Sequence, residues 1–397
     1  MSREQRIYFD HAATTPLDPR VWAAMQPFCD DMFGNPSSLH AEGRAARAAV
    51  EQARQHVAVL VGARPSEVIF TSGGTEADNL ALFGVVRAAA APVHVITTLI
   101  EHPAVLEPCR RAAREGCAVS YLPVGADGIV APEDLARALR PETRLVSVMA
   151  ANNIVGTIQP IRELARITRE YGALFHTDAV QAVGKVPLDV RYEGIDLLSL
   201  SAHKLHGPKG VGALVVRDGV LLASVVSGGG QERGLRSGTE NVVGIVGLGE
   251  AARLCRIAQG DESARLVRLR ERLIDGVLGA VPQAYLLGDR YRRLPGHACF
   301  GLSGLEGDSI KLLLALDAAG VAASAGSACN AHHATEPSYV LAAMGFDALR
   351  ARGALRITLG RFNTEAEVDR FVELLPSIVG ELSPVTSRTG VHTGVRE

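Results

Sequence analysis

The chain has 397 residues, of which 47% are hydrophobic, and its formal net charge is −2. A chain of this length can form two domains, or one large domain with a smaller one attached. Acidic and basic residues are interspersed, so the chain lacks the one-sign field that favours nucleic acid or an anionic membrane. No apolar stretch approaches the roughly 20 residues that span a bilayer, and no apolar signal segment follows residues 1–5. We therefore expect a cytoplasmic protein with no direct nucleic-acid or membrane partner.

Six cysteines are spread widely along the chain without CxxC spacing. In a chain this long the six cysteines are not expected to form a disulfide framework, and no metal site is predicted from them. We expect five of them to be inert, buried apolar filler: Cys29, Cys109, Cys117, Cys255 and Cys299.

From residue 67 onward, short β-rich runs alternate with amphipathic stretches. The β-rich runs cover residues 68–71, 93–97, 118–122, 145–149, 173–177, 196–200 and 211–216. Helices are predicted between most of them, over 76–89, 104–114, 132–139 and 161–171. This alternation predicts an α/β fold with a mostly parallel, buried sheet and helices on both faces. Ligands bind such a sheet beyond the carboxyl ends of its strands.

The character of the sequence changes near residues 251–270, a long charged helical stretch. The segments that follow, 297–302, 308–316, 355–359 and a last helix over 365–379, predict a smaller α+β domain. We place the large domain at 14–258 and the small domain at 1–13 and 259–382. Residues 383–397 are polar and unpatterned, so we expect a disordered tail.

Two short motifs follow predicted strands and bear on ligand binding. Residues 72–76, Ser-Gly-Gly-Thr-Glu, open a helix, and their glycines let backbone N–H groups approach a phosphate at its positive end. An ordinary strand-to-helix turn would use the same residues. His102 follows the next strand, where it can stack on an aromatic ring, move protons near neutral pH, or serve the structure alone.

Two further strand ends carry charged residues. Asp178 can keep a pyridinium nitrogen protonated, which makes a pyridoxal ring an electron sink, or it can cap the next helix. Lys204 follows the apolar run 195–200, within a histidine-flanked segment that leads into a glycine-proline turn. Burial favours the neutral amine that attacks an aldehyde to form a Schiff base, while a surface lysine at a strand end is the alternative reading.

These four segments, in this order, resemble the fold-type I pyridoxal-phosphate enzymes. Within them the chain resembles the NifS/IscS-type cysteine desulfurases of the class-V aminotransferase family. The resemblance extends over residues 6–382 and rests on the segments 8–16, 33–38, 71–79, 101–105, 176–181, 201–204, 228–234, 236–241 and 324–329. It implies a large domain with a mostly parallel seven-stranded sheet and a smaller α+β domain.

The resemblance also implies the roles of individual residues around pyridoxal 5'-phosphate. Lys204 would bond the cofactor aldehyde, Asp178 would pair with the pyridine nitrogen, and Gln181 would bond the ring hydroxyl. His102 would stack on the ring and assist proton transfer. The phosphate would be held by Gly74, Thr75, Ser201, His203 and, from the partner subunit of a homodimer with shared active sites, Thr239. The substrate carboxylate would be held by Asn35, Asn153 and Arg356, of which Arg356 offers a planar, bidentate fork.

Cys329 would carry the distinctive step of the family. L-Cysteine would enter, Lys204 would move the Cα proton, and Cys329 would attack the substrate sulfur to leave L-alanine and a persulfide on Cys329. A free thiol of pKa ~8.5 is only about 3% thiolate at pH 7, so a nearby cation or base must raise that fraction. The longer loop around Cys329 resembles the NifS/IscS branch and not the SufS-like one.

The sequence departs from the family pattern at two places. After Cys329 the run before Glu336 is one residue longer and carries His332 and His333, which are solvated, tune the thiolate, or bind a metal together with Cys329. Ile154 stands where the family commonly has glutamate, which puts the preference for cysteine as substrate in question.

Our leading hypothesis is a cysteine desulfurase that hands sulfur to an acceptor, such as an iron-sulfur scaffold or a sulfur-relay protein, for iron-sulfur clusters or thiolated tRNA and cofactors. A selenocysteine lyase would use the same cofactor set. An aminotransferase-like enzyme would not need Cys329. A catalytically silent scaffold for sulfur-relay partners is the alternative outside the enzymes.

Overall fold

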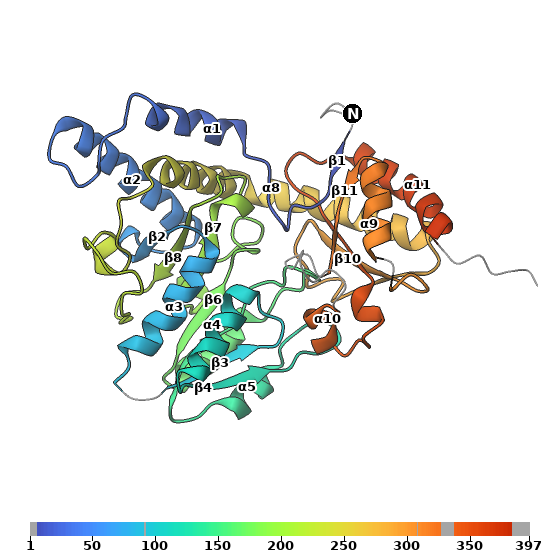
Figure 1. The fold of residues 1–397 in the computed structure, drawn as a ribbon, viewed down its shortest axis with the longest axis horizontal. Coiled ribbons are helices and arrows are strands. Elements are labelled where there is room, and N and C mark those ends of the chain that lie inside the picture. The colour runs from blue at the N-terminus through green and yellow to red at the C-terminus, as the bar shows by residue number, and fades with distance from the viewer. Residues whose placement is uncertain (1–5, 91–92, 308, 327–336, 383–397) are drawn as a thin grey trace, which may run out of the picture.

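The computed structural model describes residues 6–90, 93–307, 309–326 and 337–382. Its largest element is a seven-stranded sheet with the order β2-β8-β7-β6-β5-β3-β4 (Figure 1). The strands are β2 (Val68–Thr71), β3 (His94–Thr98), β4 (Ala118–Leu122), β5 (Thr143–Ser147), β6 (Leu174–Asp178), β7 (Leu197–Ser201) and β8 (Gly212–Val216). β8 pairs antiparallel with β2 and with β7, and the other neighbouring strands of this sheet pair in parallel. The predicted mostly parallel sheet is confirmed.

Apart from the edge strand β4, the strands of this sheet are largely buried on both faces, and successive side chains alternate between two apolar clusters. Ile69 and Leu214 pack into one cluster, with α3 (Gly74–Ala88) and α4 (Pro103–Arg114). Phe70 and Val215 pack into the other, which α1 (Pro19–Met25), α2 (Ala41–Leu60) and the first half of α8 (Val242–Ala280) help to form. The same cluster extends to α5 (Pro132–Ala138), α6 (Ile161–Glu170) and α7 (Val190–Glu193). Helices on both faces explain the continuous apolar runs in the sequence.

A second, smaller unit follows in the chain. An antiparallel sheet with the order β12-β13-β10-β9 contains β9 (Ala284–Leu286), β10 (His297–Leu302), β12 (Ser324–Ala325) and β13 (Ala354–Thr358). It shares an apolar cluster with α9 (Ser309–Ala318), α11 (Glu365–Leu382) and the last half of α8. β1 (Ile7–Tyr8) pairs in parallel with β11 (Val321–Ala322), and α10 (Tyr339–Ala343) precedes β13.

The long helix α8 joins the two units (Figure 1). Its residues up to Cys255 belong to the cluster around the large sheet, and those from Leu266 onward belong to the cluster of the small one. The predicted boundary at 258/259 falls inside this continuous helix, and we retain the division into 14–258 and 1–13 with 259–382 as a proposal.

Every predicted strand of the large sheet overlaps an observed one, and β2 and β4 have the predicted bounds. The helix expected over 251–270 is longer, since α8 begins at Val242 and ends at Ala280. Helices α1, α2, α7 and α10, and the short strands β1, β9, β11 and β12, were not predicted. The expected tail at 383–397 lies outside the described residues.

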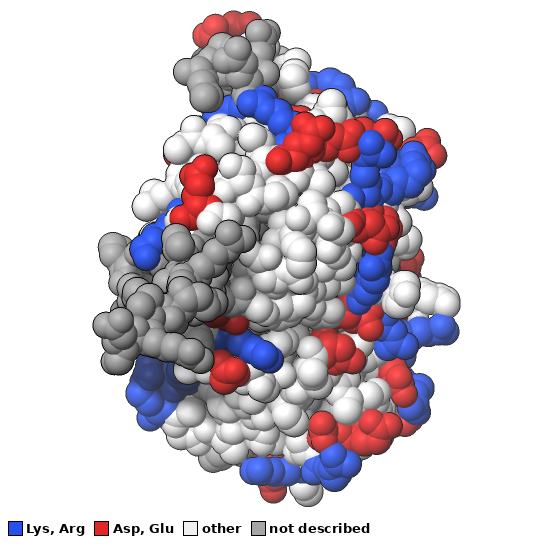
Figure 2. Space-filling model, turned by 90° about the vertical axis from the view of Figure 1, so that its right-hand side faces the viewer, with Lys and Arg blue, Asp and Glu red and all other residues white. Residues whose placement is uncertain are grey.

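The surface carries charged side chains of both signs. On the face drawn in Figure 2, basic and acidic side chains mingle along the rim of a largely uncharged area. In the described part of the chain, no helix combines the length and apolarity needed to cross a bilayer.

Cys109, Cys255 and Cys299 are buried as expected, but Cys29 is exposed and Cys117 is half-buried, so the prediction of a buried role was wrong for Cys29.

Candidate active site

A cavity of about 290 Å³ opens at the carboxyl ends of the parallel strands. Its walls come from the ends of β2, β3, β5, β6 and β7 and the segments that follow them, from residues 12–13, and from Arg356 on β13. Ten predicted site residues line it: Gly74, Thr75, His102, Asn153, Asp178, Gln181, Ser201, His203, Lys204 and Arg356. The fold thus brings together residues that are up to 282 positions apart in the sequence (74 to 356).

Three predicted site residues are not part of this cavity in the single chain. Asn35 and Thr239 are exposed and do not line it. Asn35 accepts a hydrogen bond from the Ser37 amide at 2.9 Å. Cys329 lies outside the described residues, as do His332 and His333.

Lys204 is placed by the short helical turn Ala202–Lys204 that directly follows β7. Its Nζ donates hydrogen bonds to the carbonyl oxygens of Ala12 and Ala13, the latter at 2.6 Å. Thr15 holds this turn in place, because its amide and hydroxyl both donate to the His203 carbonyl, at 3.0 and 2.8 Å. Burial, with Lys204 as the next cause, lowers the pKa of His203 to about 4, so its imidazole is neutral near pH 7. The sequence analysis did not identify the Ala12 and Ala13 carbonyls, since their role is carried by backbone atoms.

Asp178 and Gln181 follow β6, the neighbour of β7 in the sheet. Asp178 is 5% exposed, and its Oδ1 accepts a hydrogen bond from the Val180 amide at 2.9 Å. Burial raises the pKa of Asp178, while the nearby His102 and Lys204 act in the opposite direction. Because these influences oppose each other, the pKa of the Asp178 carboxyl can change when a cationic ligand binds beside it.

His102 is the N-cap of α4, where its Nδ1 accepts a hydrogen bond from the Ala104 amide at 3.1 Å. In the neutral ring the proton therefore sits on Nε2. Capping uses Nδ1 of His102, which leaves Nε2 for a functional role. The structural and the functional predictions for His102 are therefore both compatible with its position in the cavity wall.

A group of buried acids lies beside Asp178 that the sequence analysis did not single out. Asp78 also lines the cavity and is 2% exposed, and burial, increased by Asp178, raises its pKa well above the ordinary value. Its Oδ1 is 3.6 Å from Nε2 of His176, whose pKa burial lowers to about 3. His176 is therefore neutral near pH 7, and burial shifts Asp78 toward its neutral form.

The Gly73–Thr75 region forms a cradle at the N-terminus of α3. A Cβ added at Gly74 would lie 2.6 Å from Cγ2 of Val180, and one added at Gly212 would lie 2.8 Å from the Gly73 Cα. The first N–H groups of a helix have no partner within it, so they are available to an anion. With the hydroxyls of Thr75 and Ser201 in the same wall, this end of the cavity suits a phosphate.

Arg356 lies on β13 and is 1% exposed. Its Nη2 donates to the carboxylate of Asp10 at 2.8 Å and its Nη1 to the Asn153 carbonyl at 2.9 Å. Its Nε has no hydrogen-bond partner among the described residues. The guanidinium is thus held in a fixed orientation at the rim of the cavity, with donor capacity left for an anionic ligand.

Ile154, which stands where the resemblance leads one to expect glutamate, does not line the cavity. It is 3% exposed and belongs to an apolar cluster with Val155 and Leu287. Its Cγ2 would lie 3.5 Å from a Cβ placed on Gly326, the last described residue before Cys329. Ile154 therefore lies next to Gly326, where the described chain stops before Cys329, and it does not line the cavity.

Within residues that the structure describes, no three His, Cys, Asp or Glu side chains gather in a way that could hold a metal ion. The polar groups of the cavity include one lysine, two aspartates, one arginine and an anion cradle. This set matches an aromatic aldehyde that carries a basic ring nitrogen and a phosphate.

Comparison with known proteins agrees with this geometry. The pattern of the family described as aminotransferase class-V matches residues 7–371. A cysteine desulfurase IscS from Dictyoglomus turgidum is 46% identical over 387 residues, which cover 97% of each chain. The chain belongs to the aminotransferase class-V family, among its cysteine desulfurases. A cysteine desulfurase from Cereibacter sphaeroides is 49% identical over 380 residues, 95% of this chain and 97% of that one.

Solved structures lead to the same family. A NifS-like protein superposes with a TM-score of 0.89 at 39% identity, covering 95% of this chain and all of the other. The structure described as SspA in complex with cysteine has a TM-score of 0.80 at 36% identity and covers 90% of this chain and 100% of that one. The resemblance drawn from the sequence motifs is confirmed, and so is the fold-type I architecture. Cysteine desulfurases use pyridoxal phosphate, and the cavity described above fits it.

The protonation of Glu101, a buried acid, can be tested through the pH dependence of stability. Its Oε1 accepts hydrogen bonds from Thr98 Oγ1 at 2.8 Å and from the Met149 amide at 2.9 Å, and burial raises its pKa to about 8 from an ordinary 4.5. Between pH 4.5 and 8 the folded chain keeps a proton that the unfolded chain has released. The stability of the wild type therefore falls as the pH rises, by up to about 1.4 kcal/mol per pH unit from this group.

Glu101→Gln removes this proton linkage while keeping the shape of the neutral acid. We predict that its free energy of urea unfolding, relative to the wild type, increases from pH 5 to pH 8. Glu107→Gln, an exposed glutamate on α4, is the matched control and should show no such trend. Equal pH dependence in Glu101→Gln and the wild type would show that Glu101 is ionised in the folded protein.

Proposed function

We propose that this protein converts L-cysteine to L-alanine with pyridoxal 5'-phosphate and transfers the substrate sulfur to Cys329 as a persulfide. The observation that carries the proposal is the presence of Lys204, Asp178 and Arg356 in the walls of one cavity, beside a phosphate cradle. An identity of 46–49% to curated cysteine desulfurases over nearly the whole chain supports it.

Pyridoxal phosphate, when bound, supplies a conjugated electron sink for the carbanion that forms at the substrate Cα. Asp178 would pair with its ring nitrogen and Lys204 with its aldehyde carbon. Gln181 would bond the ring hydroxyl, and His102 would stack on the ring. The phosphate would be held by Gly74, Thr75, Ser201 and His203. Burial shifts Asp78 and His176, which lie close to Asp178, toward their neutral forms. The carboxylate of Asp178 would hold a proton on the ring nitrogen.

Lys204 would also take up and return the proton at the substrate Cα. A neutral amine is needed for this step, and a site that excludes water favours it. The Ala12 and Ala13 carbonyls hold the Nζ in one place before substrate arrives. His102 would assist with the proton on its Nε2, since its Nδ1 is engaged at the helix cap.

Arg356 would bind the substrate carboxylate through its planar fork, together with Asn153 and Asn35. Asp10 and the Asn153 carbonyl fix the guanidinium, so that little conformational entropy is lost when substrate binds. The substrate Cα would then be directed toward Lys204.

Cys329 would accept the sulfur. Its thiolate forms an S–S bond to the substrate sulfur, the substrate Cβ–S bond breaks, and the electron pair of that bond is retained by the carbon skeleton, which takes up a proton and leaves as alanine. The described chain approaches the substrate site just before this segment, because Ser324 on β12 pairs in register with Arg356. Cys329 follows Ser324 by five positions in the sequence.

The proposal extends to partners. Thr239 and Asn35 are exposed in the single chain, which fits a homodimer in which each subunit completes the other's site. Arg236 ties the segment that bears Thr239 to α3 through an ion pair with Glu76 at 2.8 Å. We further propose a cytoplasmic enzyme whose persulfide passes to an acceptor protein, such as an iron-sulfur scaffold or a sulfur-relay protein.

Replacement of the sulfur acceptor tests the proposed chemistry. Sulfide and alanine release from L-cysteine, measured with excess thiol, should be equal in the wild type. Cys329→Ala should lose both products by about 100-fold or more while its cofactor absorbance survives, because nucleophilic catalysis is lost and cofactor binding is not. Cys29→Ala, a change at an exposed cysteine far from the chemistry in sequence, is the matched control and should retain the wild-type rate.

Unchanged turnover of L-cysteine by Cys329→Ala would refute the role of Cys329 and favour a simple lyase or an aminotransferase. A preference for L-selenocysteine in the same assay would favour a selenocysteine lyase.

A hybrid dimer tests the shared site. We predict that Lys204→Ala chains are inactive and that Thr239→Val homodimers lose about tenfold in activity through one missing phosphate contact. A doubly tagged hybrid contains one Lys204→Ala chain and one Thr239→Val chain. One of its two sites then combines Lys204 of the Thr239→Val chain with the intact Thr239 of the partner subunit. Activity should therefore recover to about half of the wild type. If Thr239 serves its own chain, the hybrid will instead have half of the Thr239→Val rate.

A further inference from the structure

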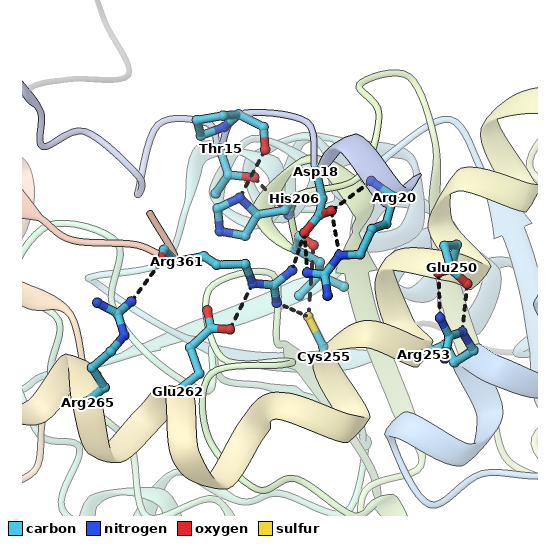
Figure 3. Close-up of polar contacts among 12 residues, drawn as sticks. Thr15, Asp18, Arg20, His206, Glu250, Arg253, Cys255, Glu262, Arg265 and Arg361 are labelled. Carbon is cyan, nitrogen blue, oxygen red and sulfur yellow. Dashed lines mark hydrogen bonds and ion pairs between the residues drawn. The ribbon is translucent and has the colours of Figure 1, made fainter. Parts of the chain in front are cut away.

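A second, smaller cavity of about 40 Å³ lies behind the active-site cavity, and the two share Ala12 and Lys204. Figure 3 shows part of its far wall, where Arg361 lies between the carboxylates of Glu262 and Asp18 and close to Cys255. Lys185 is the other amine in this wall. Only 4 of the chain's 41 basic residues are lysine, so two of the four meet here. A lysine can lose its proton near neutral pH when buried, whereas an arginine cannot.

A short run of hydrogen bonds joins Lys185 to Lys204. The Lys185 Nζ donates to Oε1 of Gln181 at 3.1 Å. The Nε2 of Gln181 donates to the Ala12 carbonyl at 2.9 Å, and this same carbonyl accepts from the Lys204 Nζ. Gln181 thus stands between the two amines.

These contacts fix the orientation of the Gln181 amide. An ammonium only donates and a carbonyl only accepts, so only one of the two amide orientations satisfies both Lys185 and Ala12. The second N–H of Nε2 is left for a group in the active-site cavity. Gln181 is 6% exposed, so its Oε1 would have no other donor nearby in the described structure if Lys185 were lost. When Lys185 is protonated, its hydrogen bond also polarises the amide and strengthens its N–H.

The backbone around Lys185 is held rigidly against α8. Ser263 Oγ donates to the Lys185 carbonyl at 2.6 Å, and Gln259 Nε2 donates to the Val186 carbonyl at 2.7 Å. Lys185 is therefore anchored independently of Gln181, as a residue that positions another must be.

The groups that face Lys185 are mostly cationic or neutral. They are Lys204, His11, His206, Cys255, Glu262 and Arg361, with His297 and Arg356 beyond them. Glu262, the one acid in the wall, is engaged by Arg361 at 2.8 Å. Burial, followed by the charge of Lys204, lowers the pKa of Lys185 to about 7. The two amines thus disfavour each other's protonation.

We propose that Lys185 is a positioning residue of the active site, which orients Gln181 toward the cofactor's ring oxygen and, when protonated, disfavours a second positive charge on Lys204. The inference rests on the proposed function, since it concerns the same bound pyridoxal phosphate.

The test compares Lys185→Met, Lys185→Arg and the wild type, with Lys311→Met on the exposed side of α9 as a matched lysine control. Two quantities are measured by titration: the dissociation constant for pyridoxal phosphate and the pH midpoint of its visible absorption change. Lys185→Met should bind the cofactor about tenfold more weakly, because a buried amide oxygen loses its donor. Its midpoint should move to higher pH, because a neighbouring positive charge is removed. Lys185→Arg, which keeps donor and charge, and Lys311→Met should stay close to the wild type in affinity.

Each outcome decides the inference. An unmoved midpoint in Lys185→Met would overturn it, even if the unfolding temperature fell, because that pattern indicates a purely structural role. Should Lys185→Met not fold, a Lys185→Arg midpoint above that of the wild type would overturn it as well. Failure of the wild type to bind pyridoxal phosphate would refute the proposed function itself, and the inference with it.

Discussion

The parallel pairing of β6 with β7 is the constraint on which the site depends. In this register Asp178 lies opposite Ser199, so the carboxylate at the end of β6 and the lysine turn after β7 leave the sheet at the same edge. Strands β2 and β3 end at that edge too, which adds the glycine cradle and His102. The N-terminal segment then crosses this edge and offers the Ala12 and Ala13 carbonyls to Lys204. The small unit contributes Arg356 from β13, so the site requires both units of the fold.

Burial controls which groups at this edge are charged. Asp78, Glu101 and His176 are all shifted by burial toward their neutral forms. Burial raises the pKa of Asp178 too, but His102, the Val180 amide and Lys204 all oppose that shift. A sheet that is apolar on both faces would otherwise neutralise every one of these groups. The position of charge in the site thus follows from which buried groups have partners.

The sequence predicted the large sheet and ten residues of the cavity because both leave strong local signals. The strands are continuous apolar runs, and the site residues stand at their ends or in motifs of the family. Helix α2 escaped prediction, although its burial pattern is amphipathic, because it is rich in alanine and arginine and lies before the strand–helix alternation begins. Asp78, Glu101 and Lys185 escaped as well, because their roles arise from neighbours that are distant in sequence. Asn35 and Thr239 were predicted from motifs, yet they lie outside the cavity of the single chain.

The central claim is that Lys204 is the residue that bonds pyridoxal phosphate in this cavity. Borohydride reduction of the cofactor-loaded protein, followed by peptide mapping, tests it most directly, and the chain's four lysines make the readout unambiguous. We predict a reduced pyridoxyl group on Lys204 alone, which disappears in Lys204→Ala. A label on Lys185, Lys209 or Lys311 in the wild type, or the absence of any label, would contradict the account.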